Sequence, residues 1–344
     1  MNRSLCVIVA LTLPTNCSNR EIPEISIPVP EAQLERVFVA TQRAPDQTRD
    51  LFGARRSIKM NYGKVVVSIP PSHALGQIEW ARNKPNPRRH FAVVDLDLFN
   101  NSDQFQTNLQ AEPPGPFNVT NIYVHGFNTS LHEALFRLAQ IKHDFQDSSP
   151  AVLFAWPSAA RSRAYVYDRD SVLFARDDLV ELMRDLSTGT DRKIALMGHS
   201  MGAQLVMEAL RQIAISGDRH LLSRVEVVIL VAPDIDPDVF RRQAKAIGKL
   251  PDEFYVFVAK QDQALRLSAF LTGRERVGVI QSAKDVEGLD VTVIDFSSLS
   301  DGKNLNHQVG LTSPEAIKTL SGLLEENPYI QNDGVTEYLA LGLE

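Results

Sequence analysis

Residues 194–210 read Ile-Ala-Leu-Met-Gly-His-Ser-Met-Gly-Ala-Gln-Leu-Val-Met-Glu-Ala-Leu, and this stretch decides the fold. Its first four residues predict a buried strand, and its last eight predict a helix. The Gly-x-Ser-x-Gly pattern between them is in the strand–turn–helix context that a nucleophile elbow requires. In such a turn the serine backbone is strained, and Gly198 and Gly202 remove side chains that would clash. We therefore predict that Ser200 is a catalytic serine; the alternative is a glycine-rich turn without chemistry.

The rest of the chain alternates strand-like apolar runs with amphipathic helical runs. Continuous runs of Val, Ile, Leu and Phe are typical of strands that are covered on both faces. Hairpin-like strands near the beginning, followed by β-α alternation, predict an α/β fold with a mostly parallel, doubly wound sheet and antiparallel N-terminal edge strands. The expected strands are residues 37–40, 65–69, 91–94, 121–124, 152–155, 194–197, 225–231, 254–259 and 291–296.

We expect one folded domain, at residues 37–326. It follows a leader at residues 1–17 and a polar tether with several prolines at residues 18–36, a composition that suits a semi-extended linker. A C-terminal tail is expected at residues 327–344.

The leader has a short positive region followed by a short apolar core, which is the layout of a secretory signal. Both cysteines, Cys6 and Cys17, lie within it, so the folded domain offers no disulfide and no thiolate metal site. Cys17 stands where a bacterial lipoprotein leader carries its lipidated cysteine, which makes it the lipidation candidate and the expected membrane tether. We therefore expect an exported protein, either periplasmic or anchored to a membrane, rather than a cytoplasmic one.

Charge and motif content argue against two classes of function. The formal net charge is −6, and no block of Lys and Arg offers a surface for nucleic acid. No His-Glu-x-x-His motif is present, which disfavours a metallohydrolase. Asp234, Asp236 and Asp238 begin like a calcium loop, but Val239 and Lys245 stand where that loop needs Gly and Glu. We expect no metal and no cofactor.

A serine hydroxyl is a weak nucleophile, so it needs a base and an acid that orients the base. After an elbow of this kind, the acid and then the histidine follow in chain order. His307, in the loop after the last expected strand, is the predicted base, since His220 precedes every suitable acid. Asp262, two strands after the elbow, is the favoured acid, and Asp234, one strand after it, is the alternative.

Acyl transfer also needs hydrogen-bond donors for the oxyanion. The backbone N–H of Met201, directly after the serine, is the first expected donor. The second is expected from Phe127, in the His-Gly turn that follows the strand at residues 121–124. Gly126 lets this turn approach closely, and His125 is expected to be structural.

Several further stretches accompany the pentapeptide: Val37-Phe38-Val39-Ala40-Thr41-Gln42-Arg43, Phe52-Gly53-Ala54-Arg55-Arg56-Ser57, Val67-Ser68-Ile69-Pro70-Pro71-Ser72-His73, Val124-His125-Gly126-Phe127-Asn128, Phe154-Ala155-Trp156-Pro157-Ser158 and Ala232-Pro233-Asp234-Ile235-Asp236. With these and the Asp262 and His307 loops, the chain resembles a bacterial α/β-hydrolase family of unassigned function, whose members are often named esterase/lipase superfamily proteins. The resemblance covers residues 37–325. It implies the α/β-hydrolase fold, with Ser200 as nucleophile, Asp262 as acid and His307 as base, and it supplies no substrate.

The favoured function is a serine hydrolase that cleaves a small-molecule or lipid ester through an acyl-enzyme. A thioesterase, a peptidase or an acyltransferase would use the same residues and stays open. An alternative from a different class is a non-catalytic envelope binding protein on a hydrolase scaffold.

Overall fold

The computed structural model describes residues 25–46, 52–300, 303–326 and 337–341. The expected leader with Cys17, and the expected tether up to residue 24, lie outside the described residues. Within the described part of the chain, no helix is long and apolar enough to cross a membrane.

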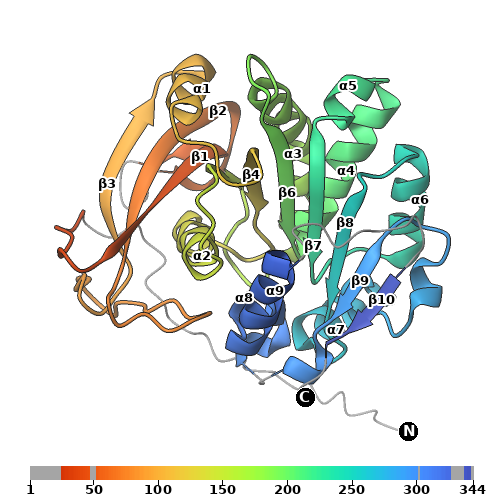
Figure 1. Cartoon of the computed structure of the whole chain (residues 1–344). Helices are drawn as coiled ribbons and strands as arrows, with labels where there is room; N and C mark the ends of the chain where they lie inside the picture. The colour runs from red at the N-terminus through yellow and green to blue at the C-terminus, as the bar shows by residue number, and fades with distance from the viewer. Residues whose placement is uncertain (1–24, 47–51, 301–302, 327–336, 342–344) are drawn as a thin grey trace, which may run out of the picture.

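The described residues form one ten-stranded sheet with the order β10-β9-β8-β7-β6-β4-β5-β1-β2-β3 (Figure 1). From β1 to β10 across the sheet, every neighbouring pair is parallel, whereas β2 runs antiparallel to both β1 and β3. This arrangement confirms the predicted mostly parallel sheet with antiparallel N-terminal edge strands. The strands are β1 Gln33–Pro45, β2 Phe52–Ile69, β3 Ala92–Phe99, β4 Val119–Val124, β5 Ala151–Ala155, β6 Lys193–His199, β7 Val225–Val231, β8 Glu253–Val258, β9 Thr292–Asp295 and β10 Glu337–Ala340.

Helices cover both faces of the sheet. Helices α1, α3, α4 and α6 pack in one hydrophobic core, and α2, α8 and α9 pack in a second core on the opposite face. The α-helices are α1 Ser102–Gln110, α2 Leu131–Asp144, α3 Tyr165–Leu186, α4 Met201–Ile215, α5 Arg219–Leu222, α6 Pro237–Ile247, α7 Gln263–Thr272, α8 Val309–Thr312 and α9 Pro314–Glu326.

Strand β5 shows why its residues form a central strand. Val152 and Phe154 belong to the core on the α3 and α4 side, whereas Ala151, Leu153 and Ala155 belong to the core on the α2 side. All five are buried, as expected for a parallel strand between two helical layers. Each large apolar side chain buried in this way contributes about 1.5–3 kcal/mol. The strands that carry the site are therefore held firmly from both sides.

Strands β1 and β2 extend furthest beyond their predicted ranges. β1 begins at Gln33, inside the expected tether, and β2 begins at Phe52 rather than at residue 65. The first half of β2 contains Arg55, Arg56 and Lys59 and is mostly half-buried, and it has no continuous apolar run. Its partner β1, not its own hydrophobicity, makes it a strand.

A tenth strand lies within the expected C-terminal tail. β10, Glu337–Ala340, pairs in parallel with β9, Thr292–Asp295, at the edge of the sheet. A run of four residues is too short to give a strand signal by itself, and the open edge of β9 supplies the partner.

The carboxyl ends of the central strands lie at one edge of the molecule. In Figure 1 this is the lower edge, since α5, which precedes β7, lies at the top and α7, which follows β8, lies at the bottom. In open α/β sheets, ligands bind at the edge formed by the carboxyl ends of the strands.

Candidate active site

Ser200 stands between the end of β6 and the first residue of α4. Its backbone has φ 54° and ψ −117°, a left-handed conformation for a residue with a side chain. Such strain costs about 1–3 kcal/mol and persists only where the surroundings impose it. Two backbone hydrogen bonds hold the turn: the Ser200 N–H donates to Val231 O at 2.9 Å, and the Asp234 N–H donates to Ser200 O at 3.2 Å.

The elbow glycines are required by close contacts with backbone. A Cβ at Gly202 would lie 2.3 Å from Val124 O and 2.4 Å from His125 O. A Cβ at Gly198 would lie 2.7 Å from the Cα of Ala203. Since these neighbours are backbone atoms of a packed sheet and helix, they cannot move aside cheaply.

Asp262 and His307 form a hydrogen-bonded pair. His307 Nδ1 lies 2.6 Å from Asp262 Oδ2, and Asp262 is fully buried. The other oxygen, Oδ1, caps α7 by accepting the Leu265 N–H at 2.8 Å, which fixes the orientation of the carboxylate. The pairing places the proton of a neutral His307 on Nδ1 and leaves Nε2 as an acceptor.

The charge of this pair also sets the basicity of His307. Burial alone would lower the pKa of His307, but the charge and hydrogen bond of Asp262, assisted by Asp234, raise it above the ordinary value of 6.5. A raised pKa makes the imidazole a stronger proton acceptor.

The ring of His307 packs against the ring of His199, the residue before Ser200 in the elbow. The two imidazole rings are 4.7 Å apart between centroids, and burial together with His307 holds the pKa of His199 well below its ordinary value. Within the described part of the chain, the Ser200 hydroxyl forms no hydrogen bond, to His307 or to another group. The structure therefore brings the predicted acid and base together beside the elbow, without a direct hydrogen bond from Ser200 to His307.

Asp234, the alternative acid, is bonded to other partners. Its Oδ1 accepts from Ser268 Oγ at 2.6 Å and lies 3.1 Å from Arg276 Nε, and its Oδ2 accepts from Tyr165 Oη at 2.9 Å. All three partners come from segments that surround the elbow. Asp234 thus ties α3 and α7 to the turn that follows β7.

The turn after β4 packs against the elbow. A Cβ at Gly126 would lie 2.7 Å from His199 Nδ1 and 3.0 Å from Ser200 Cβ, so only glycine allows this approach. Neither the Phe127 N–H nor the Met201 N–H has a hydrogen-bond partner among the described residues. Each of the two turns that meet at Ser200 therefore carries one backbone N–H without a hydrogen-bond partner among the described residues.

His125 holds the end of β4. It is buried and stacks on Trp156 with a centroid separation of 4.9 Å, and Trp156 Nε1 donates to its carbonyl at 2.7 Å. Burial, with the positive charge of Arg43 nearby, lowers the pKa of His125 to about 3. A neutral, stacked ring of this kind serves packing.

One buried acidic residue positions the Phe127 turn, a role that the sequence does not reveal. Asp168, buried in the first turn of α3, accepts from Asn128 N at 3.2 Å, from Ser158 Oγ at 2.6 Å and from Ala159 N at 2.7 Å. An acidic residue in the first turn of a helix is the only local signal for this role, and it is a common one.

Arg43, in β1, also supports the loop that contains the Phe127 turn. Its Nη2 donates to Thr129 O at 2.8 Å and its Nη1 donates to Ser158 O at 3.1 Å. The buried guanidinium thus holds the loops after β4 and β5 together through their carbonyl groups. An arginine in a strand gives no sequence signal for such a task.

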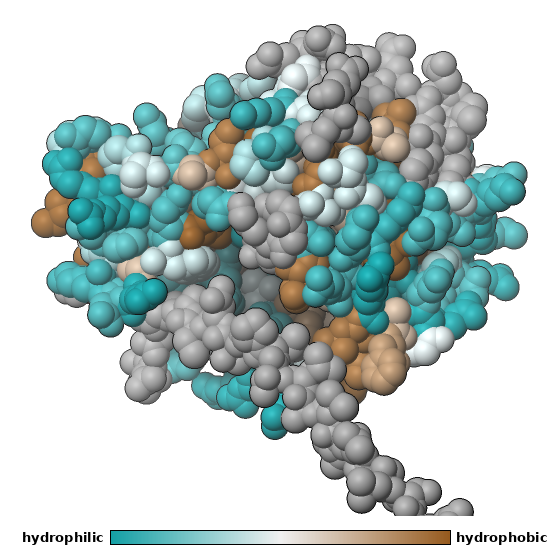
Figure 2. Space-filling model, turned by 90° about the horizontal axis from the view of Figure 1, so that it is seen from below, coloured by the Kyte–Doolittle hydropathy of each residue, from teal (hydrophilic) through white to brown (hydrophobic). Residues whose placement is uncertain are grey.

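Figure 2 looks onto the edge where the strands end, and it shows brown hydrophobic surface beside a hollow in a largely hydrophilic face. Helix α7, which Asp262 caps, contributes exposed apolar side chains: Leu267 is 42% exposed, Phe270 83% and Leu271 60%. Apolar surface therefore lies along the helix that Asp262 caps.

A sequence model of the alpha/beta hydrolases of unknown function (DUF900) matches residues 99–323. No curated protein sequence matches the chain. Similar solved structures include a dienelactone hydrolase from Anabaena variabilis (12% identity over 88% of this chain and 100% of that chain, TM-score 0.37). They also include an esterase from Pyrobaculum calidifontis (13%, 86% and 86%, TM-score 0.33) and a fungal esterase from Rhizomucor miehei (10%, 93% and 76%, TM-score 0.30).

Proposed function

The chain belongs to the family of alpha/beta hydrolases of unknown function, and we propose that it is a serine hydrolase that cleaves carboxylic esters. One observation carries the proposal. The Asp262–His307 pair, at 2.6 Å, lies beside a serine in a strained elbow, where two unused backbone donors also meet. A nucleophile, a base with its acid, and an oxyanion site are the parts that acyl transfer requires.

In the proposed reaction, Ser200 Oγ attacks the ester carbonyl while His307 Nε2 takes its proton. Asp262 keeps the imidazole in the correct tautomer and stabilises the imidazolium. The N–H groups of Met201 and Phe127 donate to the oxyanion, and His307 then returns the proton to the leaving alcohol. Water hydrolyses the acyl-enzyme by the same route. The Ser200–His307 hydrogen bond has to form when the substrate binds, as is common for catalytic hydrogen bonds that are loose without substrate.

The exposed apolar residues on α7 support an ester with an apolar acyl or alcohol group. Phe270 and Leu271 lie on the helix that the carboxylate of Asp262 caps. Burying such side chains against a substrate is worth about 25 cal/mol per Å² of apolar surface. A lipid-like or other small apolar ester therefore suits this edge better than a highly charged one.

The test is a Ser200→Ala variant assayed with p-nitrophenyl esters of graded acyl length and with a fluorophosphonate probe. We expect hydrolysis to fall by about 10³-fold or more and probe labelling to disappear, since the nucleophile is removed. Ser216→Ala, at the far end of the same helix, is the matched control and should keep both. Unchanged hydrolysis in Ser200→Ala, or a wild-type protein that the probe does not label, would reject the proposal in favour of a non-catalytic scaffold.

A further inference from the structure

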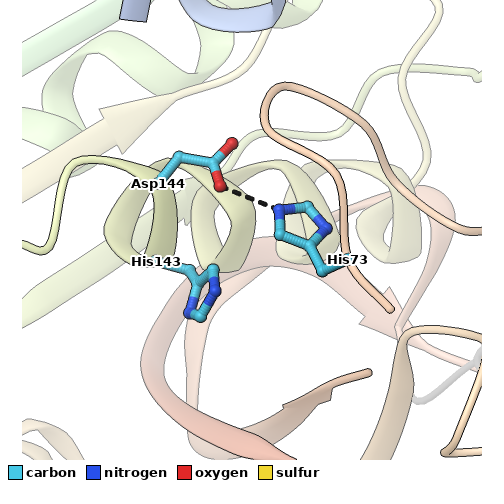
Figure 3. A group of neighbouring side chains, drawn as sticks. All are labelled: His73, His143 and Asp144. Carbon is cyan, nitrogen blue, oxygen red and sulfur yellow. Dashed lines mark hydrogen bonds and ion pairs between the residues drawn. The ribbon is translucent and has the colours of Figure 1, made fainter. Parts of the chain in front are cut away.

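Two histidines and an aspartate come together at the C-terminal end of α2, away from the proposed active site (Figure 3). His143 and Asp144 are the last two residues of α2, and His73 lies in the segment between β2 and β3. One possible ligand atom from each residue lies within 4.8 Å of the others. Helix α2 begins next to the Phe127 turn, and its fourteen residues separate the two places by about 20 Å at 1.5 Å per residue.

We propose that His73, His143 and Asp144 bind a divalent transition-metal ion, with Zn²⁺ as the preferred ion. Two imidazoles and one carboxylate are a donor set that suits zinc, which takes nitrogen and oxygen ligands at about 2.0–2.2 Å. His73 Nε2 and Asp144 Oδ1 lie 2.8 Å apart in a direct hydrogen bond, so an ion would take the place of the proton between them. His143 completes three protein ligands, and water would complete a tetrahedron.

The outer nitrogen of each histidine faces a carboxylate. Glu79 Oε2 lies 2.9 Å from His73 Nδ1, and Glu35 Oε1 lies 3.7 Å from His143 Nδ1. The hydrogen bond to Glu79 fixes the orientation of His73 and turns its Nε2 to Asp144, as carboxylates do for metal-bound histidines. Glu35 lies beyond hydrogen-bond distance and adds negative charge beside His143.

Hydrogen bonds also fix the orientation of the Asp144 carboxylate. Its Oδ2 accepts from the Gly76 N–H at 2.7 Å and from Gln140 Nε2, which leaves Oδ1 directed at His73. Asp144 is fully buried as a side chain, so its orientation does not depend on solvent. A ligand that is already oriented loses little conformational entropy when an ion binds.

The charge balance favours a cation. Three carboxylates, from Glu35, Glu79 and Asp144, surround two imidazoles. The metal-binding form of imidazole is neutral, so the three carboxylates leave negative charge that a divalent ion would offset.

The site would connect three parts of the fold. His73 and Glu79 belong to the segment between β2 and β3, His143 and Asp144 to α2, and Glu35 to β1. The side chain of His143 is 26% exposed, which gives an ion a way in from solvent. An ion bound here would link the segment to the helix and so stabilise the folded chain by mass action.

The experiment titrates tag-free, EDTA-treated full-length protein with ZnCl₂ in a calorimeter and records the melting temperature with and without the ion. We expect one ion per chain with micromolar or tighter affinity, together with a higher melting temperature. Co²⁺ in place of Zn²⁺ should give the visible absorption of a four-coordinate site. Because His73 bridges two carboxylates and its loss endangers the fold, His143→Gln is the first variant, and it should weaken binding at least tenfold.

Two control variants separate this site from other histidines. His220→Gln, on exposed α5, and His307→Gln, in the proposed active site, should bind Zn²⁺ like the wild type. The proposal is overturned if the wild type binds no Zn²⁺ at millimolar concentration, which leaves the cluster a network of ion pairs. It is equally overturned if His143→Gln binds as the wild type does, or if His307→Gln removes the binding.

Discussion

The carboxylates of Asp262 and Asp234 lie near the same imidazole but are bonded to different partners. Asp262 accepts from His307 Nδ1, whereas Asp234 is bonded to Tyr165, Ser268 and Arg276. Both negative charges raise the pKa of His307, with Asp262 contributing more. Replacement of Asp262 should therefore reduce activity more than replacement of Asp234, since only Asp262 is hydrogen-bonded to the imidazole.

The pH profile of kcat/KM should distinguish the two carboxylates. A general base acts when it is neutral, so activity is lost as pH falls through the pKa of His307, and we expect the acid limb above pH 6.5 in the wild type. Asp262→Asn should move this limb to lower pH and reduce kcat/KM by about 10⁴-fold, since the tautomer is no longer fixed. Asp234→Asn should cause a smaller shift and a smaller loss. A larger loss in Asp234→Asn than in Asp262→Asn would make Asp234 the acid.

The order of the strands along the chain was enough to rank Asp262 above Asp234 as the acid from the sequence. Strands in a parallel sheet deliver the loops after them to one edge, so Ser200, Asp262 and His307 had to lie near each other once the strands were recognised. The predicted family membership is confirmed by the match over residues 99–323. The His73 cluster could not be predicted, because its members are about 70 residues apart and no strand order connects them.

Helix α3 positions the Phe127 turn through its first residues. Asp168 binds two segments at once, since it accepts from Asn128 after β4 and from Ser158 and Ala159 after β5. Its partners are mostly backbone N–H groups, which any residue carries, so no sequence motif reveals them. Burial raises the pKa of Asp168, and its hydrogen bonds offset part of that effect.

Asp168→Asn should reduce kcat more than it changes KM. The amide nitrogen cannot accept a hydrogen bond, so part of the support of the Phe127 turn is lost, and one misplaced oxyanion donor costs about 10²–10³-fold in kcat. Asp170→Asn, on the exposed face of the same turn, is the control and should behave as the wild type. Steady-state kinetics on a p-nitrophenyl ester, with the melting temperature of each variant, provide the measurement. Equal kinetics in the two variants would show that Asp168 serves stability alone.

The elements were predictable where hydrophobic runs are long and local. The strands at residues 194–197 and 225–231 are found within β6 and β7. By contrast, the first half of β2 and all of β10 depend on a partner strand that is distant in the sequence. Local pattern carries little information about such pairs.

The two edges of the sheet are formed by different kinds of strand pair, one antiparallel and one parallel. At one side β3 closes the antiparallel group, and at the other β10 covers β9, whose four residues are buried. Beyond β10, the Leu341 N–H donates to Asp295 O at 3.1 Å, and Ser298 Oγ donates to Leu341 O. The C-terminal strand therefore covers an apolar edge just before the loop that holds His307.

A chain that ends at residue 326 should be less stable and more prone to associate than the full chain. Removing β10 exposes the backbone groups and apolar side chains of β9, and an open, apolar edge strand pairs readily with other chains. Thermal unfolding and light scattering at several concentrations provide the measurement. A chain that ends at Leu341 keeps β10 and is the control. Equal melting temperatures and equal scattering for the two chains would contradict this role of β10.

The position of β1 in the sheet has a consequence for synthesis of the chain. The parallel neighbour of β1 is β5, and the contact between Thr41 and Ala155 spans 114 residues. A growing chain can pair β1 with β2 early, but the other edge of β1 has no partner until β5 has been made. At about 5–20 residues per second this interval lasts roughly 5–20 s, during which an apolar strand edge stays open. During this interval the open edge of β1 can pair with the wrong strand, so the consequence of its position lies in how the chain is made and not in how the finished site works.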